Sequence, residues 1–362
     1  MTENHSDKSE IVFTNQVSKA LDDMASRLCA ASVFVLVDDV VASCVLPFLQ
    51  AESTTISDAD GIITVRSGEQ YKNIDTLASI WTQLGNLGAT RDSLLINVGG
   101  GVITDMGAFA AATFKRGIRF INVPTTLLAS VDASVGGKTG INFNSLKNEV
   151  GVIRRADGVI ISTAFLRTLT SQELMSGYAE MVKHGFITSE ETTNRLMTYD
   201  ITQYDPSTLL ELLQESVEIK RNIVKQDLND HGIRKSLNLG HTAAHAFEAL
   251  ALQRSAPLAH GYAVAFGLLV ALILSRVKFD FPSQHLHQYA KFVQSNYGAF
   301  EFSCDDYPML LSFMHHDKKN YSTSEVSYVL LRDYGKVEID VPISDADITA
   351  ALDIYRDLLH LP

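Results

Sequence analysis

The stretch SLLINVGGGVITDMGAFAAATFKRGIRFINVPTTLLASVDASVGGKTGINFNSLKNEVG, residues 93–151, decides the fold of this chain. An apolar run over 94–98 ends in three glycines, and small residues with helical spacing follow over 105–114. A second apolar run, over 118–123, ends in Pro124. Strand, glycine turn, helix and strand in this order predict a βαβ unit.

The glycine turn indicates a phosphate site. Gly99 and Gly101 leave room for a phosphate to approach the backbone, and the N-terminus of the next helix offers N–H groups and partial positive charge. Thr104 stands where a dinucleotide-binding fingerprint has its third glycine, so the motif is incomplete. A tight turn that merely needs glycine is the alternative interpretation.

Local charge favours the phosphate site. Residues 99–155 carry seven lysines and arginines but only three acids, in a chain whose net charge is −12. Gly136 and Gly137 directly precede Lys138 and Thr139, but the upstream glycine of a P-loop is missing. We therefore expect a small anionic ligand bound by backbone and lysines, and not a P-loop nucleotidase.

Composition limits the possible classes of protein. The chain has 362 residues, 46% hydrophobic and 20% charged, which is enough for two domains with cores of their own. Its acidic balance argues against a nucleic-acid partner, and three widely spaced cysteines fit a reducing compartment. The first residues are polar and lack the apolar region of a signal peptide, and the longest apolar run, 261–275, is expected to be a buried helix. We expect a cytoplasmic protein with neither membrane nor nucleic acid as partner.

The order of elements predicts the fold class. Apolar runs at 11–13, 32–37 and 61–65 alternate with helical patterns and extend the βαβ unit into a parallel sheet, whose last strand is expected at 158–162. From residue 171 on the periodicity is helical, apart from a hairpin expected over 326–340. We predict an α/β N-terminal domain with a parallel, Rossmann-like sheet (1–165) and a mainly α-helical C-terminal domain (166–362). The active site is expected in the cleft between them.

The acid that ends the 32–37 strand, Asp38, has two possible roles. It can bind a ribose hydroxyl, as acids do at this place in dinucleotide-binding sheets, or it can cap the helix that follows. The sequence leaves both roles open.

The helical half contains a candidate metal site. His241 and His245 stand four residues apart, and therefore on one face of a helix, while Glu180 and His260 lie on other predicted helices. Imidazoles and a carboxylate suit a zinc-like ion. Spacing alone favours His241 and His245 as co-ligands, and a histidine pair without metal is the alternative. Thr242 replaces the glutamate of an HExxH motif, which argues against a zinc protease.

Together, these motifs resemble the 3-dehydroquinate synthase family from about residue 67 to 319. The matching stretches are SGEQYKN (67–73), GGGVITDMGAFAAATFKRG (99–117), VPTTLLASVDASVGGKTGIN (123–142), Lys147-Asn148, AEMVKHG (179–185), LNLGHTAAHAFE (237–248), His260-Gly261 and DKKN (317–320). So many motifs in the family's order are far more specific than any one of them.

The resemblance implies an enzyme, a phosphate-eliminating carbon–oxygen lyase that uses NAD and a divalent metal, zinc or cobalt. Its substrate would be a phosphorylated seven-carbon sugar acid, 3-deoxy-D-arabino-heptulosonate 7-phosphate (DAHP), and its product 3-dehydroquinate, in the shikimate pathway to chorismate and aromatic amino acids. The steps would be transient oxidation by NAD, phosphate elimination, re-reduction and an internal aldol closure.

The resemblance also implies site residues. The metal ligands would be Glu180, His241 and His260, which moves His245 to the substrate phosphate. Phosphate would be held by Lys138, Asn148, His245 and Lys318, carboxylate by Lys220, Arg234 and Asn238, with Asp132 and Lys183 also lining the substrate. NAD would contact Asp38, Glu69, Lys72, Gly100, Gly101, Asp105, Thr125, Thr126, Lys138, Lys147, Phe165, Thr168, Leu169 and Glu173. Arg116 resembles an arginine that reaches a neighbouring subunit's site, which implies a homodimer.

The chain departs from the family pattern in several places, namely over 143–146, at Ala244 and Phe247, over 227–230, and at Tyr262. These departures leave open a sister cyclase that acts on sedoheptulose 7-phosphate, glucose 6-phosphate or an amino analogue of DAHP. A metal-dependent polyol dehydrogenase and a binding protein without activity are further alternatives. Lys220 and Arg234 favour a substrate with a carboxylate.

Overall fold

The computed structural model describes residues 9–144, 146–316 and 325–361. Contacts divide the chain into two compact units, Met1–Thr170 with Tyr204–Val217, and Ser171–Gln203 with Glu218–Pro362. The first unit thus extends past the expected boundary at 165 and includes a later segment, 204–217. Thr163 Oγ1 donates a hydrogen bond to the carbonyl of Pro206 at 3.0 Å and so links the segment 204–217 to the rest of the first unit.

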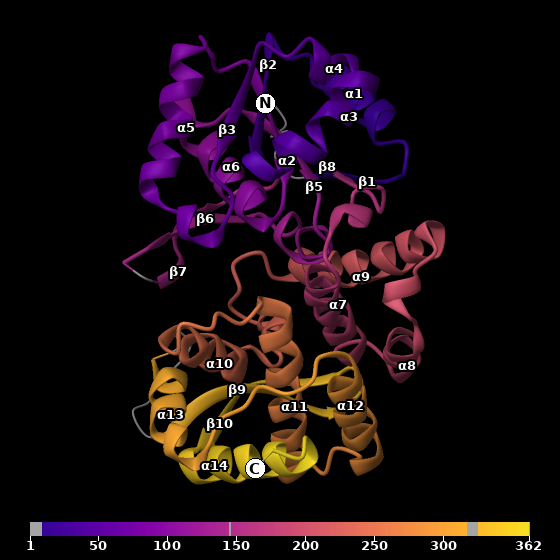
Figure 1. Ribbon diagram of the computed structural model, residues 1–362, viewed down its shortest axis with the longest axis vertical. Helices are drawn as coiled ribbons and strands as arrows, with labels where there is room; N and C mark the ends of the chain where they lie inside the picture. The colour runs from indigo at the N-terminus through magenta and orange to yellow at the C-terminus, as the bar shows by residue number, and fades with distance from the viewer. Residues whose placement is uncertain (1–8, 145, 317–324, 362) are drawn as a thin grey trace. The chain divides into compact units, whose positions relative to one another are not determined.

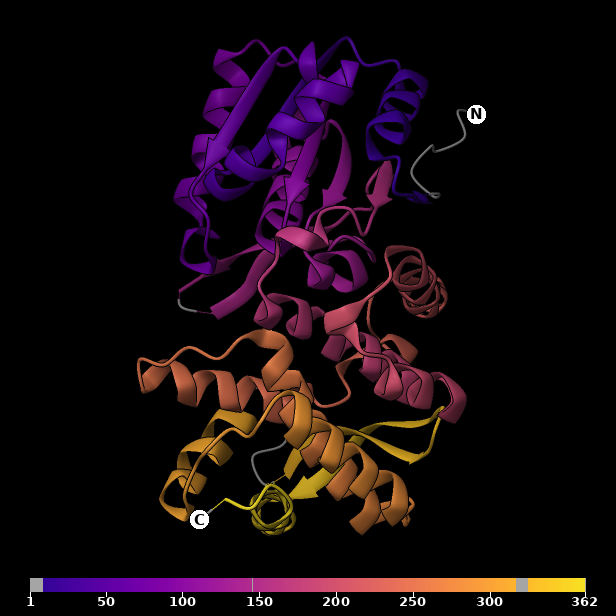
Figure 2. The same ribbon diagram turned by 45° about the vertical axis from the view of Figure 1, so that its right-hand side comes forward.

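The first unit is built on a six-stranded sheet (Figure 1). Its strands, in the spatial order β1-β8-β5-β4-β2-β3, are β1 (Glu10–Phe13), β2 (Ser32–Asp38), β3 (Gly61–Val65), β4 (Ser93–Gly99), β5 (Arg119–Pro124) and β8 (Gly158–Ile161). Every pairing is parallel, and the strand arrows run the same way in Figure 2. The expected parallel sheet is confirmed.

Helices cover both faces of this sheet, so β4 is buried along its whole length. One face, which includes Val35, Ile96 and Val123, packs against α1 (Val17–Leu28), α2 (Asp39–Cys44), α3 (Leu46–Glu52) and α4 (Thr54–Ser57). The other face is covered by α5 (Ile74–Asn86) and α6 (Gly101–Thr113) (Figure 1). α6 begins at Gly101, one turn earlier than its apolar pattern predicts.

The chain changes direction across the sheet between β2 and β4. From β2 it moves to the edge strand β3, whereas from β4 it moves the opposite way, through β5 to β8. In open α/β sheets, ligands bind at the carboxyl ends of the two strands that flank such a reversal. Asp38 ends β2 and Gly99 ends β4, so the topology places the glycine turn at this point.

A second, two-stranded sheet in this unit was not expected from the sequence. β6 (Lys138–Phe143) and β7 (Leu146–Ile153) form an antiparallel hairpin. The described side chains of β7 are all exposed, so the strand lacks the buried apolar face that reveals a strand in a sequence. Asn148, within β7, has a left-handed backbone with φ 52°.

The second unit is mainly helical, as expected. Its helices are α7 (Ser171–Phe186), α8 (Glu190–Thr198), the last part of α9 (Pro206–Gln226), α10 (His241–Gln253), α11 (His260–Phe279), α12 (Ser283–Asn296), α13 (Tyr307–His315) and α14 (Asp345–Leu358). The expected hairpin is present as β9 (Glu325–Asp333) and β10 (Lys336–Ser344), and both strands are longer than predicted.

α11 is the central helix of this unit, and it contacts α7, α10, α12, α14 and β9. Among the described helices, only α11 is long and apolar enough to cross a membrane by length and composition. However, 72% of that apolar window is buried inside the protein. α11 is therefore the buried core helix that the apolar run 261–275 predicts.

Candidate functional site

The carboxyl ends of β4 and β5 bring several predicted NAD residues together. Gly100 is the N-cap of α6 and Gly101 its first residue, and none of the described side chains caps this helix. Thr125 follows β5, and its N–H donates to the carbonyl of Gly99 at 3.0 Å. The first turn of α6 thus presents backbone N–H groups without a side-chain cap, which suits the phosphates of a dinucleotide.

Asp38 caps a helix. Its carboxylate accepts a hydrogen bond from the N–H of Val41, the third residue of α2, at 2.7 Å. Burial raises the pKa of Asp38, and the bond from Val41 only partly offsets this effect. Of the two expected roles, the structure confirms the capping role, and the ribose contact stays a prediction.

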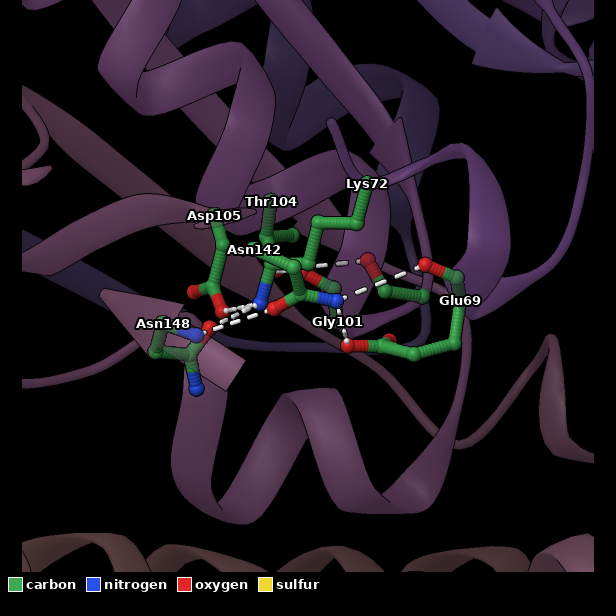
Figure 3. A network of polar contacts seen from close by, with 8 residues as sticks. Glu69, Lys72, Gly101, Thr104, Asp105, Asn142 and Asn148 are labelled. Carbon is green, nitrogen blue, oxygen red and sulfur yellow. Dashed lines mark hydrogen bonds and ion pairs between the residues drawn. The ribbon is translucent and has the colours of Figure 1, made fainter. Parts of the chain in front are cut away.

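Lys72 is a buried cation at the centre of a polar network (Figure 3). Its side chain is 4% exposed, and Nζ lies 2.6 Å from Asp105 Oδ2 and 2.6 Å from Asn148 Oδ1. Burial raises the pKa of Asp105, although the ion pair with Lys72 opposes that rise. Lys72, a predicted NAD residue, therefore contacts a second predicted NAD residue and a predicted phosphate residue directly.

The other predicted residues of the first unit lie on several different elements. Phe165 is buried in the apolar cluster beneath the sheet, so its side chain is a core side chain. Arg116 is exposed and has φ 71°. The remainder are Glu69 in a short 3₁₀ helix, Thr126 after β5, Asp132 in the π-helical turn Ala129–Ala133, Lys138 at the start of β6, Lys147 on β7, and Thr168 and Leu169 at the end of a second 3₁₀ helix.

Glu180, His241 and His260 converge within the second unit. Their ligand atoms all lie within 4.8 Å of one another, and this is the one such group among the described residues. Glu180 Oε1 lies 3.6 Å from His241 Nε2 and 3.5 Å from His260 Nε2. This oxygen is buried and accepts no hydrogen bond from any described residue. A buried carboxylate oxygen that faces two imidazole nitrogens fits a metal ion coordinated by all three atoms.

His245, which spacing alone favours as a ligand, is not part of this cluster. It lies one turn after His241 on α10, its side chain is exposed, and the two ring centroids are 5.6 Å apart. The structure therefore assembles the ligand set that the family motifs imply, and not the i, i+4 pair.

Two glycines of α11 allow the ligand-bearing helices to approach. A Cβ on Gly261 would lie 1.8 Å from the carbonyl oxygen of Ser176 on α7, and the N–H of Gly261 donates to Ser176 Oγ at 3.0 Å. A Cβ on Gly267 would lie 2.2 Å from the carbonyl oxygen of Gly240, the N-cap of α10. Because no larger residue fits at either place, the close packing of α7, α10 and α11 depends on glycine.

The three ligands differ in protonation. Burial opposes ionisation of Glu180, but Lys183 and the two histidines outweigh it and hold the pKa of Glu180 well below its usual range. Burial and Lys183 lower the pKa of His241, so this imidazole is neutral. Burial also acts to lower the pKa of His260, but Glu180 and Glu248 outweigh it and raise this pKa to about 10. Without metal, His260 therefore carries a proton.

Metal binding is expected to release about one proton per ion near neutral pH, because protonated His260 cannot coordinate until it loses its proton. The affinity for Zn²⁺ should therefore rise about tenfold per pH unit below the pKa of His260. Isothermal titration calorimetry with Zn²⁺ in two buffers of different ionisation enthalpy measures the number of protons released, because the buffer that takes up the protons contributes its own enthalpy. Glu248→Gln is the control variant, since it removes a negative charge beside His260 and should reduce the release. Binding without proton release in the wild type would contradict this assignment.

The predicted substrate cations of the second unit are largely buried. Lys183 is 1% exposed and donates to Glu180 Oε2, which leaves Oε1 for a metal. Lys220 on α9 and Arg234 on the 3₁₀ helix Ile233–Asn238 are 5% and 3% exposed. Arg234 donates to the carbonyl of Leu228 at 2.6 Å, which fixes part of its guanidinium.

Three more of the predicted site residues belong to the second half of the chain. Asn238 ends the 3₁₀ helix that carries Arg234 and is half-buried. Glu173 lies in the first turn of α7, where it is exposed. Lys318 lies outside the described residues.

The sequence analysis missed Glu248. Its Oε2 lies 3.5 Å from His260 Nδ1, on the nitrogen that does not face Glu180. A carboxylate in this place orients a metal-binding imidazole and favours its proper tautomer. Glu248 stands seven residues after His241 on α10, two turns along the same face, and this spacing is the signal that could have revealed it.

Most of the chain is similar to known proteins. Residues 62–176 match the family described as 3-dehydroquinate synthase N-terminal, and residues 177–320 match 3-dehydroquinate synthase C-terminal. The 3-dehydroquinate synthase of Parabacteroides distasonis is 44% identical over 350 residues, which cover 97% of this chain and 98% of that protein.

Two solved structures share the fold. 2-Deoxy-scyllo-inosose synthase, complexed with carbaglucose-6-phosphate, NAD⁺ and Co²⁺, has a TM-score of 0.83 at 21% identity and covers 96% of this chain and 97% of its own. 2-Epi-5-epi-valiolone synthase from Streptomyces hygroscopicus, with NAD⁺ and Zn²⁺ bound, also has a TM-score of 0.83 at 21% identity, with 99% of each chain covered. At this level of identity the likeness concerns the fold.

Proposed function

The chain belongs to the 3-dehydroquinate synthase family, and from this premise we propose that it converts DAHP into 3-dehydroquinate and inorganic phosphate. The observation that carries the proposal is the convergence of the Glu180, His241 and His260 ligand atoms within 4.8 Å. We assign NAD to the first unit, and metal and substrate mainly to the second.

Both cofactors have residues that suit them. Glu180, His241 and His260 would hold Zn²⁺ or Co²⁺, and the turn at Gly100 and Gly101 would hold the phosphates of NAD. When bound, NAD takes a hydride from one substrate alcohol and later returns it, while the metal polarises that alcohol. The bound NAD and divalent ions of the two solved relatives support this proposal.

The chain's own cations would bind the two anionic ends of the substrate. Arg234 and Lys220 would hold the carboxylate, since a planar guanidinium that is already fixed on one side loses little freedom when it binds. Lys138, Asn148, His245 and Lys318 would hold the phosphate, which leaves with the electrons of its C–O bond as the neighbouring carbon loses a proton. Asp132 and Lys183 would complete the lining around the reacting carbons.

Assembly and location follow from the same proposal. Exposed Arg116, the last residue of the 3₁₀ helix Phe114–Arg116 that follows α6, would reach the site of a second subunit in a homodimer. The cytoplasm is the proposed location, because the substrate and NAD are intracellular metabolites.

The proposed function is tested by phosphate release from DAHP with added NAD and Zn²⁺, while NADH absorbance is followed in parallel. We expect phosphate release without accumulation of NADH. Stoichiometric NADH would indicate a polyol dehydrogenase instead. Faster turnover of sedoheptulose 7-phosphate than of DAHP would indicate a sister cyclase, and the departures over 143–146 and at Tyr262 would be the first places to examine.

A further inference from the structure

Asn142, on β6, closes a ring of hydrogen bonds with Lys72 and Asn148 (Figure 3). The N–H of Asn142 donates to the carbonyl of Lys72 at 2.8 Å. Lys72 Nζ donates to Asn148 Oδ1 at 2.6 Å, and the N–H of Asn148 donates to Asn142 Oδ1 at 2.9 Å. Each residue of the ring is thus held by the other two.

The side-chain amide of Asn142 is used at both of its ends. Oδ1 accepts from the N–H of Asn148, while Nδ2 donates to Glu69 Oε1 at 2.8 Å (Figure 3). Only a group that is an acceptor on one side and a donor on the other satisfies both partners. Asn142 therefore joins the loop that carries Glu69 and Lys72 to the exposed strand β7.

Two hydrogen bonds fix the orientation of Asn148, which has a left-handed backbone. Its backbone has φ 52°, in the left-handed region that asparagine enters more readily than most residues other than glycine. Here the bond from its N–H to Asn142 and the bond from Lys72 to its side chain act together. These two bonds direct the Asn148 side chain toward Lys72 and Asp105.

We infer that Asn142 is a positioning residue that acts through Glu69 and Asn148. It couples the residues that would contact NAD to the residue that would contact the substrate phosphate, so that both sets of contacts form together. The inference rests on the proposed function, since it takes Glu69 and Lys72 as NAD residues and Asn148 as a phosphate residue. Asn142 itself has no assigned contact with either ligand.

The first test is Asn142→Ala, with Asn86→Ala as the matched control, because Asn86 is an exposed asparagine at the end of α5 and lies outside the ring. The variant Asn142→Ala loses three side-chain hydrogen bonds, one with the N–H of Asn148 and two with the carboxylate and the carbonyl of Glu69. This loss is expected to raise the Kd of NAD and the KM of DAHP each about tenfold. The kcat should fall less, because Asn142 would not touch the reacting atoms. Asn86→Ala should leave all three values unchanged. NAD binding is measured by fluorescence titration, which needs no turnover.

The second test is Asn142→Asp, which keeps the size of the side chain and the acceptor for Asn148 but sets a carboxylate against Glu69. Two carboxylates at this distance share a proton at acid pH and repel each other once both are ionised. NAD affinity relative to wild type should therefore be near normal at about pH 5 and at least about tenfold weaker at about pH 8. Asn142→Ala should show no such dependence. The other charged groups of the surrounding segments are Lys72, Asp105, Asp132, Lys147 and Glu149.

The outcomes separate the two proposals. NAD affinity and KM within twofold of wild type in Asn142→Ala would overturn the positioning role. So would equal pH dependence of the Ala and Asp variants, which would indicate a purely structural residue. If Asn142→Ala does not fold, the isosteric Asp variant still decides through its pH dependence. Wild-type protein that binds no NAD and releases no phosphate would overturn the proposed function itself.

Discussion

His260→Ala is expected to lose bound metal and to lower kcat/KM by at least about a thousandfold, while the protein stays folded. Three protein ligands hold the proposed ion, and removal of one leaves Glu180 and His241 as an incomplete set. The metal supplies several kcal/mol of transition-state stabilisation, which corresponds to about this loss in rate. The fold should tolerate the change because His260 begins α11 and its side chain is 29% exposed.

Metal content after dialysis, measured by inductively coupled plasma mass spectrometry, is the decisive readout. His245→Ala is the matched control, since it removes an imidazole one turn from His241 that is not part of the cluster. The His245→Ala variant should keep its metal, even though the substitution weakens binding of the substrate phosphate. If His260→Ala kept metal and His245→Ala lost it, the ligands would be the i, i+4 pair after all. NAD titration of both variants checks that the first unit remains intact.

Lys72→Met is expected to destabilise the first unit by about 3 kcal/mol, because it leaves the Asp105 carboxylate, which is only 16% exposed, without its partner. For a unit of this size, the loss corresponds to a thermal midpoint lower by about 6–12 °C. NAD binding should weaken as well, since the residues around the glycine turn lose their central cation. Thermal unfolding followed by circular dichroism, with NAD titration of the folded protein, measures both effects.

The loss of stability should depend on pH. Burial raises the pKa of Asp105 above its unfolded value, and removal of Lys72 raises it further. A carboxyl with a raised pKa contributes stability that is present below its unfolded pKa and lost as pH rises through its folded pKa. The deficit of Lys72→Met should therefore be small near about pH 4 and largest at neutral pH.

Two controls make this result specific. Lys72→Met combined with Asp105→Asn removes both charges and should recover much of the stability at neutral pH. Lys235→Met breaks an ion pair with Asp340 of the same 2.6 Å length, but Asp340 is 47% exposed, so its cost should be below about 1 kcal/mol. Equal losses for Lys72→Met and Lys235→Met would show that burial does not govern the energy of the Lys72–Asp105 pair.

Local sequence pattern was enough to predict most elements of the fold. Buried strands such as β2 and β4 are short apolar runs, and they end in Asp38 and in the glycine turn as expected. The hairpin β6–β7 escaped prediction because its exposed second strand has no buried face and is held by backbone pairing with a partner strand. Sequence periodicity reports burial, and an exposed strand leaves little trace of it.

The candidate site, like the fold, was predicted from the sequence only in part. The family motifs predicted Glu180, His241 and His260 as the metal ligands. Spacing alone predicted His241 and His245, because spacing relates residues only along one helix. The approach of three helices, which glycine at positions 261 and 267 permits, decided which side chains meet. The parallel sheet, the glycine turn and the kinds of ligand follow from local sequence pattern and motifs. The contact of Glu248 with His260 and the ring through Asn142 depend on tertiary packing, because residues far apart in the chain meet only when packed elements bring them together.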